Sequence, residues 1–297
     1  MATIKGGEFL IKEIKAADIF VSEEINEEQK MMKDAVIEFI EREVWPHKER
    51  FENKDYAFTE EIMRKAGEMG FLGVSIPQKY GGIGMGFVST MLVTDYISSA
   101  TGSLATAFGA HTGIGTMPIF LYGTEEQKQK YLPFLTSGEK FGAYCLTEPE
   151  SGSDAAALRT KAVRTNEGYE LTGTKSFISG GDYSDLYIVM CRTGDETPKG
   201  ISAIIVDKEA AGLSFGAQER KMGWRAQPTA QVMMDNCSTP AENLLGSEGD
   251  GFSYAMMGLD GGRLNIAAAA LGGAQAAYEK ALSYSSERKA FGRSIDK

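Results

Sequence analysis

The chain has 297 residues, 42% of them hydrophobic and 24% charged, a composition typical of a folded globular protein with room for two domains. Its net charge of −10, from 31 basic and 41 acidic residues, argues against nucleic acid or an anionic membrane as a partner. Three separated cysteines and two histidines exclude a disulfide framework and a histidine-rich metal centre, and we expect a cytoplasmic protein with reduced thiols, no signal peptide and no membrane span.

The first half of the chain predicts an all-helical domain over residues 26–140, preceded by an arm over residues 1–25. Asn26 and Gln29 form a capping box, and apolar residues at helical spacing follow until Pro46. A second capping box, Thr124 with Gln127, opens a short helix that ends at Gly138. Further helices are expected over residues 59–70, 87–99 and 103–122.

From residue 141 the pattern changes to short strands separated by turn residues, and this β domain extends to residue 248. The expected strands are residues 141–146, 158–164, 169–179, 186–192, 201–206 and 229–234. No helical pattern lies between them, so we predict antiparallel connections and a sandwich or barrel. A helical pattern returns near residue 250 and continues to about residue 288, which makes the fold class α+β.

Residues 144–154, Tyr-Cys-Leu-Thr-Glu-Pro-Glu-Ser-Gly-Ser-Asp, predict a bend at the end of a buried strand. Pro149 and Gly152 favour the turn. Hydroxyl groups and backbone N–H groups without a strand partner suit phosphate oxygens or the ring of a planar cofactor. Taken alone, the same composition also fits an ordinary serine-rich loop.

This stretch resembles the signature of the acyl-CoA dehydrogenase family, Gly/Ala-x-(Leu/Val)-Thr-Glu-Pro-x-(Ser/Ala)-Gly-Ser-Asp. Other landmarks of the family follow in the same order and extend the resemblance from about residue 23 to the last residues. They are Ser-Phe-Ile-Ser at 176–179, Lys-Met-Gly-Trp at 221–224, Pro-Ala-Glu-Asn-Leu-Leu-Gly at 240–246, Leu-Asp-Gly-Gly-Arg at 259–263 and Glu-Arg-Lys-Ala-Phe-Gly at 287–292.

The resemblance implies a helical domain, a β middle domain and a C-terminal helical bundle, of which residues 249–297 would be the first helix. We therefore expect the chain to be a fragment. The resemblance further implies FAD as cofactor and oxidation of acyl-CoA to trans-2-enoyl-CoA in fatty-acid β-oxidation. Electron-transferring flavoprotein is the expected acceptor, and the full-length protein is expected to be a homodimer or homotetramer.

Carried over to this sequence, the resemblance places three groups of residues at the site. Cofactor contacts are expected from Tyr144, Leu146, Thr147, Ser153, Phe177, Ile178 and Ser179, with Thr147 closest to flavin N5, and from Arg288 and Phe291 toward the FAD of a neighbouring subunit. Substrate contacts are expected from Ser153, Asp260 and Arg263, the last two at i and i+3 on one side of a helix.

The catalytic base is the missing part. The isovaleryl branch of the family has a glutamate directly before the helix arginine, where this chain has Gly262, and other branches place it at a position that would lie beyond Lys297. No acid in the chain inherits the role, and Glu148 and Asp154 are expected to stabilise the bend. Two alternatives remain open: an acyl-CoA oxidase or flavin monooxygenase of the same fold, and a non-catalytic homologue that binds flavin or CoA.

Overall fold

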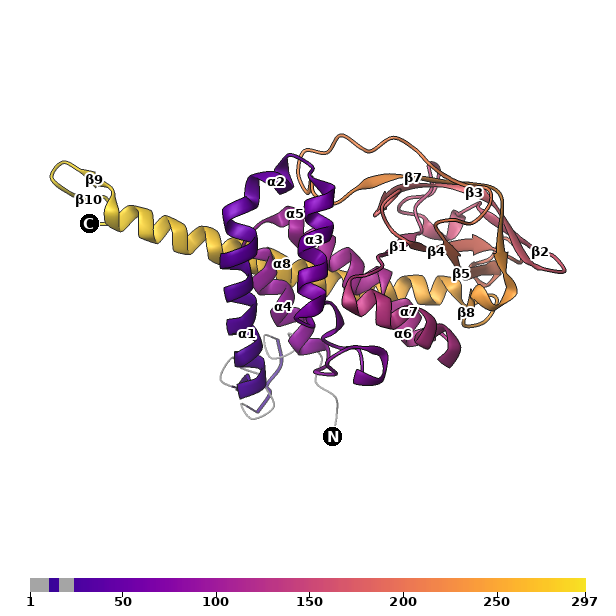
Figure 1. The fold of residues 1–297 in the computed structure, drawn as a ribbon, viewed down its shortest axis with the longest axis horizontal. Helices are drawn as coiled ribbons and strands as arrows, with labels where there is room; N and C mark the ends of the chain where they lie inside the picture. The colour runs from indigo at the N-terminus through magenta and orange to yellow at the C-terminus, as the bar shows by residue number, and fades with distance from the viewer. Residues whose placement is uncertain (1–10, 16–23) are drawn as a thin grey trace.

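The computed structural model describes residues 11–15 and 24–297, so most of the predicted arm lies outside the described residues. Figure 1 shows helices α1–α7 at the middle of an elongated molecule and the β-sheet at one end. Helix α8 extends along both parts and projects beyond the helices at the other end. The α-helices are α1 (Glu27–Phe39), α2 (Lys48–Glu52), α3 (Tyr56–Glu68), α4 (Phe87–Ser98), α5 (Gly102–Gly109), α6 (Met117–Tyr122), α7 (Glu125–Ser137) and α8 (Gly251–Glu287).

The helix signals of the sequence act largely as predicted. Both capping boxes form, at the starts of α1 and α7, and Gly138 ends α7 with a φ of 73°. The helix expected from residue 59 begins earlier, because the Asp55 side chain accepts the Phe58 N–H and caps α3. The helix expected over 103–122 is interrupted by a π-helix, η8 (Ala110–Gly115), before α6 resumes with Pro118 in its first turn, where its missing N–H is tolerated.

The middle of the chain forms one eight-stranded mixed sheet, in the order β6-β7-β3-β2-β4-β5-β8 with β1 paired to β4. Short strands β9 (Lys289–Ala290) and β10 (Arg293–Ser294) form a separate hairpin after α8. The strands of the main sheet are β1 (Gly142–Cys145), β2 (Lys161–Arg164), β3 (Gly168–Ser179), β4 (Leu186–Arg192), β5 (Ile201–Asp207), β6 (Leu213–Phe215), β7 (Thr229–Pro240) and β8 (Leu244–Leu245).

The helical region, the sheet and the final helix confirm the predicted fold class. Two pairings differ from the antiparallel expectation: β1 runs parallel to β4 over four residues, and β2 meets β4 in parallel at one residue pair. The β2–β3 hairpin lies between β1 and β4 in the chain, so β4 enters the sheet again in the direction of β1.

Strand β4 is buried on both faces, which explains its continuous apolar sequence. Leu186, Ile188 and Met190 pack in a core shared with helices α6 and α7, whereas Tyr187 and Val189 belong to a core on the other face of the sheet. The sheet is therefore fixed against the helical region on one side. Within residues 11–15 and 24–297, no helix combines the length and hydropathy needed to cross a membrane.

Helix α8 crosses α4 at a glycine. A Cβ at Gly272 would lie 1.8 Å from the Asp95 carbonyl oxygen, so the two backbones approach more closely than any other residue type would permit. This agrees with the Gly- and Ala-rich composition of the helix. Seven large apolar side chains of α8 are at least half exposed: Met257, Leu264, Ile266, Leu271, Tyr278, Leu282 and Tyr284.

Candidate functional site

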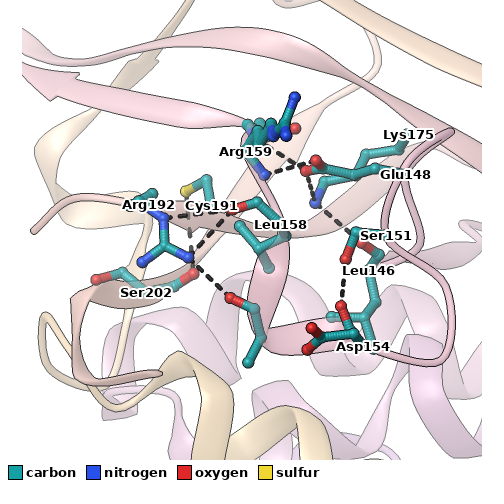
Figure 2. Close-up of polar contacts among 12 residues, drawn as sticks. Leu146, Glu148, Ser151, Asp154, Leu158, Arg159, Lys175, Cys191, Arg192 and Ser202 are labelled. Carbon is teal, nitrogen blue, oxygen red and sulfur yellow. Dashed lines mark hydrogen bonds and ion pairs between the residues drawn. The ribbon is translucent and has the colours of Figure 1, made fainter. Parts of the chain in front are cut away.

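The bend after β1 is built around a buried carboxylate. Glu148 Oε2 accepts the Arg159 N–H at 2.6 Å, and Oε1 accepts the Thr160 N–H at 2.9 Å. The Lys175 ammonium, fully buried on β3, donates to Glu148 Oε1 at 2.8 Å and to the Leu146 carbonyl oxygen at 3.0 Å. Figure 2 shows these contacts meeting inside the bend. Glu148 thus has the bend-stabilising role that the sequence predicts.

Charge pairing decides the protonation of this carboxylate. Burial opposes ionisation, but the Lys175 ammonium and the N–H donors outweigh it and hold the pKa of Glu148 below its ordinary value. Burial lowers the pKa of Lys175, and the carboxylate beside it opposes this shift. Because each charge has the other as its partner, removing either one would leave a buried charge unpaired.

A second buried cation supports the continuation of the bend. The Arg192 guanidinium lies beside residues 155–158, where it donates to the carbonyl oxygens of Ala156 and Leu158 at 2.9 and 3.1 Å (Figure 2). Closer to the turn, Ser151 Oγ donates to the Asp154 carbonyl oxygen at 2.6 Å. Buried side chains therefore hold the side of the bend that faces the protein interior. The side that faces away from the interior, here called the outer side, is left to solvent or a ligand.

Strand β3 lies directly beside the bend and is irregular there. The Ser176 N–H donates to the Thr147 carbonyl oxygen at 2.8 Å, while the pairing of β3 with β7 is interrupted between Lys175 and Ile178. Within this bulge Phe177 has a φ of 58° and an exposed fraction of 67%. A bulky residue with positive φ is unusual and directs an aromatic ring outward next to the bend.

Three predicted cofactor contacts carry hydroxyl groups with no partner. Thr147 and Ser179 are half-buried and Ser153 is exposed, and none of their hydroxyls makes a hydrogen bond within the part of the chain that the structure describes. These groups could donate to ring or phosphate oxygens of a ligand. Three of the predicted residues, one from the bend and two from strand β3, are therefore grouped around the Ser176–Thr147 hydrogen bond: Thr147, Phe177 and Ser179.

Three other predicted contacts turn inward. Tyr144 and Leu146 are buried in the core shared with the helices, and Ile178 is buried on the opposite face of the sheet. Their side chains pack in the protein, so a ring at the bend would meet their backbone. The Tyr144 hydroxyl is buried without a hydrogen-bond partner in the described chain, and burial raises its pKa.

A cavity of about 330 Å³ lies between helices α5, η8 and α8 and extends to Ser179. Its lining is mostly small and apolar, and among the described residues Trp224, from the loop before β7, is the one aromatic residue in it. An adjoining cavity of about 200 Å³ lies between α4, α6 and α8 and shares Gly262 and Asn265 with the first. Mostly apolar cavities with few polar groups are typical binding sites for organic ligands.

The remaining predicted residues lie on or after α8. Asp260 and Arg263, the expected substrate contacts, form an ion pair with each other, with both side chains 73% exposed. Arg288 caps the end of α8, and Phe291 is fully exposed in the β9–β10 hairpin with a φ of 52°. Figure 1 shows this hairpin at the opposite end of the molecule from the sheet, so the structure does not bring these two residues to the bend of the same chain.

Three residues with evident roles were not among the predicted site residues. Lys175 holds the bend, Trp224 lines the larger cavity, and Asn265 borders both cavities. A lysine in the middle of a predicted strand was a usable signal for the first, and Trp224 belongs to a quoted landmark. Asn265 gave no signal, because one asparagine in an Ala-rich helix looks like an exposed position.

Comparison with known proteins identifies relatives of the chain. Sequence profiles of the acyl-CoA dehydrogenase N-terminal, middle and C-terminal domains match residues 26–139, 143–237 and 249–297. The chain is 42% identical over 273 residues to the mitochondrial isobutyryl-CoA dehydrogenase of Dictyostelium discoideum. That alignment covers 92% of this chain and 65% of the relative, so this chain spans about two thirds of the relative's length.

Two solved structures extend the comparison. An acyl-CoA dehydrogenase complexed with FAD from Bacillus anthracis is 39% identical with a TM-score of 0.92, covering 98% of this chain and 50% of that chain. A chain from a study of the electron transferring flavoprotein of Acidaminococcus fermentans is 41% identical with a TM-score of 0.89, covering 93% and 73%. The chain described here belongs to the acyl-CoA dehydrogenase family.

Proposed function

We propose that the protein is an FAD-dependent acyl-CoA dehydrogenase in which the bend after β1 and the bulge of β3 face the flavin. The observation that carries this proposal is the exposed Phe177 ring beside the unpartnered hydroxyls of Thr147 and Ser179. Family membership and the FAD complex of the Bacillus anthracis relative support FAD as the cofactor.

The residues present fit this cofactor. A flat aromatic ring offers a stacking surface for an isoalloxazine system, and hydroxyl groups next to it can donate to polar atoms at the ring edge. Ser153, exposed on the bend, is proposed to contact the phosphate or CoA part of a ligand. Because Lys175 and Arg192 hold the bend from within, these groups are fixed before a ligand arrives.

The larger cavity would receive the acyl group, since it begins at Ser179 and has an apolar lining suited to an alkyl chain. Bound FAD would supply the hydride acceptor for the β-hydrogen. The chain's own contribution is to orient the thioester, exclude water from the apolar cavity and offer donors to the developing charge on the carbonyl oxygen.

The proton acceptor is assigned to no residue of the described chain. Among the residues that the structure describes, no aspartate or glutamate lines either cavity, and the buried Glu148 is paired with Lys175. Gly262, at the position of the isovaleryl-branch glutamate, lines both cavities and carries no side chain. The proposal therefore separates ligand binding, which these residues perform, from proton abstraction.

Asp260 and Arg263 are proposed to contact the CoA part at the outer side of α8, where their exposed pair is free to rearrange. Arg288 and Phe291 are proposed to reach the FAD of a second subunit in a homodimer or homotetramer, because they lie far from the bend of their own chain. Electron-transferring flavoprotein is proposed as the electron acceptor, in keeping with the chain from the Acidaminococcus fermentans study.

The test is titration of the purified protein with FAD, in which the quenching of flavin fluorescence measures binding. Ser179→Ala removes one proposed donor and should raise the Kd for FAD about three- to tenfold. Ser214→Ala is the matched control, because Ser214 is an exposed β6 serine whose side chain makes no hydrogen bond in the described chain. Equal Kd values for Ser179→Ala and wild type would contradict the proposed flavin surface.

Addition of butyryl-CoA to the FAD-loaded protein tests the substrate class. Binding without oxygen should perturb the flavin absorbance spectrum, because the thioester would lie against the ring. An unchanged spectrum at millimolar butyryl-CoA would contradict the acyl-CoA assignment. Peroxide formation in air, measured in parallel, would replace the dehydrogenase assignment with an oxidase of the same fold.

A further inference from the structure

Asn265 on α8 is a buried amide with an unmade hydrogen bond. Its exposed fraction is 7%, and its Nδ2 donates to the Gly109 carbonyl oxygen at 3.4 Å. Its Oδ1 has no partner within the described chain. Buried acceptors are nearly always satisfied in folded proteins, so an unpartnered one in a cavity wall points to a ligand or a bound water.

Exchanging the amide oxygen and nitrogen does not satisfy the group. The exchange would set Oδ1 against the Gly109 carbonyl oxygen, which is also an acceptor, and would leave the NH₂ group without a partner. Nearby hydroxyls cannot donate to Oδ1 either. Those of Thr106 and Thr112 donate to carbonyl oxygens one helical turn earlier, at 2.9 and 2.8 Å.

The wall around Asn265 is shaped to hold it. A Cβ at Gly109 would lie 3.3 Å from both amide atoms, and one at Gly113 would lie 3.3 Å from Nδ2. Both glycines come from the segment that includes η8, and π-helical turns recur at functional sites. The asparagine therefore lies in a fitted position and not in a loose gap.

Asn265 lies where the two cavities meet. It and Gly262 line both the 330 Å³ cavity that begins at Ser179 and the adjoining 200 Å³ cavity. The second cavity is rich in large apolar side chains, from Phe87, Met91, Met117, Leu121 and Met257. By its lining alone, the second cavity would favour the far end of a long alkyl chain.

We propose that Asn265 is a specificity-determining residue that restricts the protein to short acyl groups. The inference rests on the proposed function, in which the acyl group enters the larger cavity from the side of Ser179. A short chain would end before Asn265 and leave Oδ1 to a water molecule. A long chain that continued into the second cavity would cover Oδ1 and displace that water without offering a hydrogen bond, which disfavours binding.

The test compares butyryl-CoA with octanoyl-CoA on the FAD-loaded full chain, with Kd measured by calorimetry. Asn265→Leu keeps the side-chain size and removes the polar atoms. It should tighten octanoyl-CoA binding about tenfold and change butyryl-CoA binding less than threefold. Gln275→Leu, an exposed change on the same helix, is the control and should alter neither Kd.

Urea midpoints of each variant check folding, and Asn265→Ala serves if the leucine variant does not fold. The ratio of the two Kd values separates specificity from structural damage, because damage to the cavity would weaken both ligands together. An unchanged ratio in Asn265→Leu or Asn265→Ala, with butyryl-CoA still bound, would overturn this inference alone. Failure of the wild-type protein to bind either acyl-CoA would instead overturn the proposed function.

Discussion

The two walls of the proposed site are fixed by opposite means. The bend after β1 is held by buried charge, through the Glu148–Lys175 pair and its backbone donors. Helix α8 is held by close packing against α4, because Gly272 has no side chain and its backbone can approach the Asp95 carbonyl oxygen. The first wall depends on electrostatics in a dry interior and the second on close packing, so different substitutions should damage them.

The largest effect is expected from breaking the buried pair. Lys175→Met leaves the Glu148 carboxylate buried without its cation, and should lower the free energy of unfolding by about 3–5 kcal/mol. Urea denaturation at pH 7 measures this loss. Arg42→Met removes an exposed partner of Glu38 and should cost less than about 1 kcal/mol. Equal losses in the two variants would show that the buried pair has no special role.

The packing wall is tested by adding one methyl group. Gly272→Ala places a Cβ 1.8 Å from the Asp95 carbonyl oxygen, and the resulting separation of α4 and α8 should cost about 3 kcal/mol. Gly258→Ala is the control on the same helix, because its Cβ would meet nothing within 4 Å. That change should stabilise the protein by about 0.5–1 kcal/mol. Thermal unfolding of both variants gives the comparison, and a stable Gly272→Ala would contradict the close approach.

A smaller effect comes from the residue that joins β1 to the helical region. His111 is buried, with Nε2 at 2.8 Å from the Leu135 carbonyl oxygen and Nδ1 accepting the Gly142 N–H at 3.3 Å. Burial lowers its pKa to about 4 from 6.5. Between pH 6.5 and 4, His111 is therefore protonated in the unfolded chain and neutral in the folded chain. Its contribution to the free energy of unfolding decreases as the pH falls through this range.

This linkage predicts a loss of about 2 kcal/mol of stability between pH 7 and pH 5 in the wild-type protein. His111→Gln should lack most of this loss, whatever its stability at pH 7. His47→Gln, at the exposed histidine, should keep it. Urea denaturation at the two pH values measures the difference, and the same pH dependence in all three proteins would contradict the buried neutral His111.

The sequence predicted the local features that depend on neighbouring residues. Both capping boxes, the glycine at the end of α7 and the range of β4 follow from short patterns, and all are present. The parallel pairing of β1 with β4 was not predictable in this way, because it depends on how the β2–β3 hairpin returns the chain to the sheet.

The candidate site was predicted only in part. The family resemblance named Thr147, Phe177 and Ser179, and the structure brings these three residues together. The inward orientation of Tyr144, Leu146 and Ile178 follows from the alternation of side chains along strands and from a bulge that the sequence did not reveal. Asn265 required the structure, since only the arrangement of three helices shows that its amide is enclosed.

Hydrogen–deuterium exchange with and without FAD tests the central claim most directly. If the bend and the β3 bulge face the flavin, saturating FAD should slow amide exchange in residues 147–157 and 175–180 more than in the strands on the far side of the sheet. Saturable FAD binding that left exchange in both segments unchanged would contradict the account.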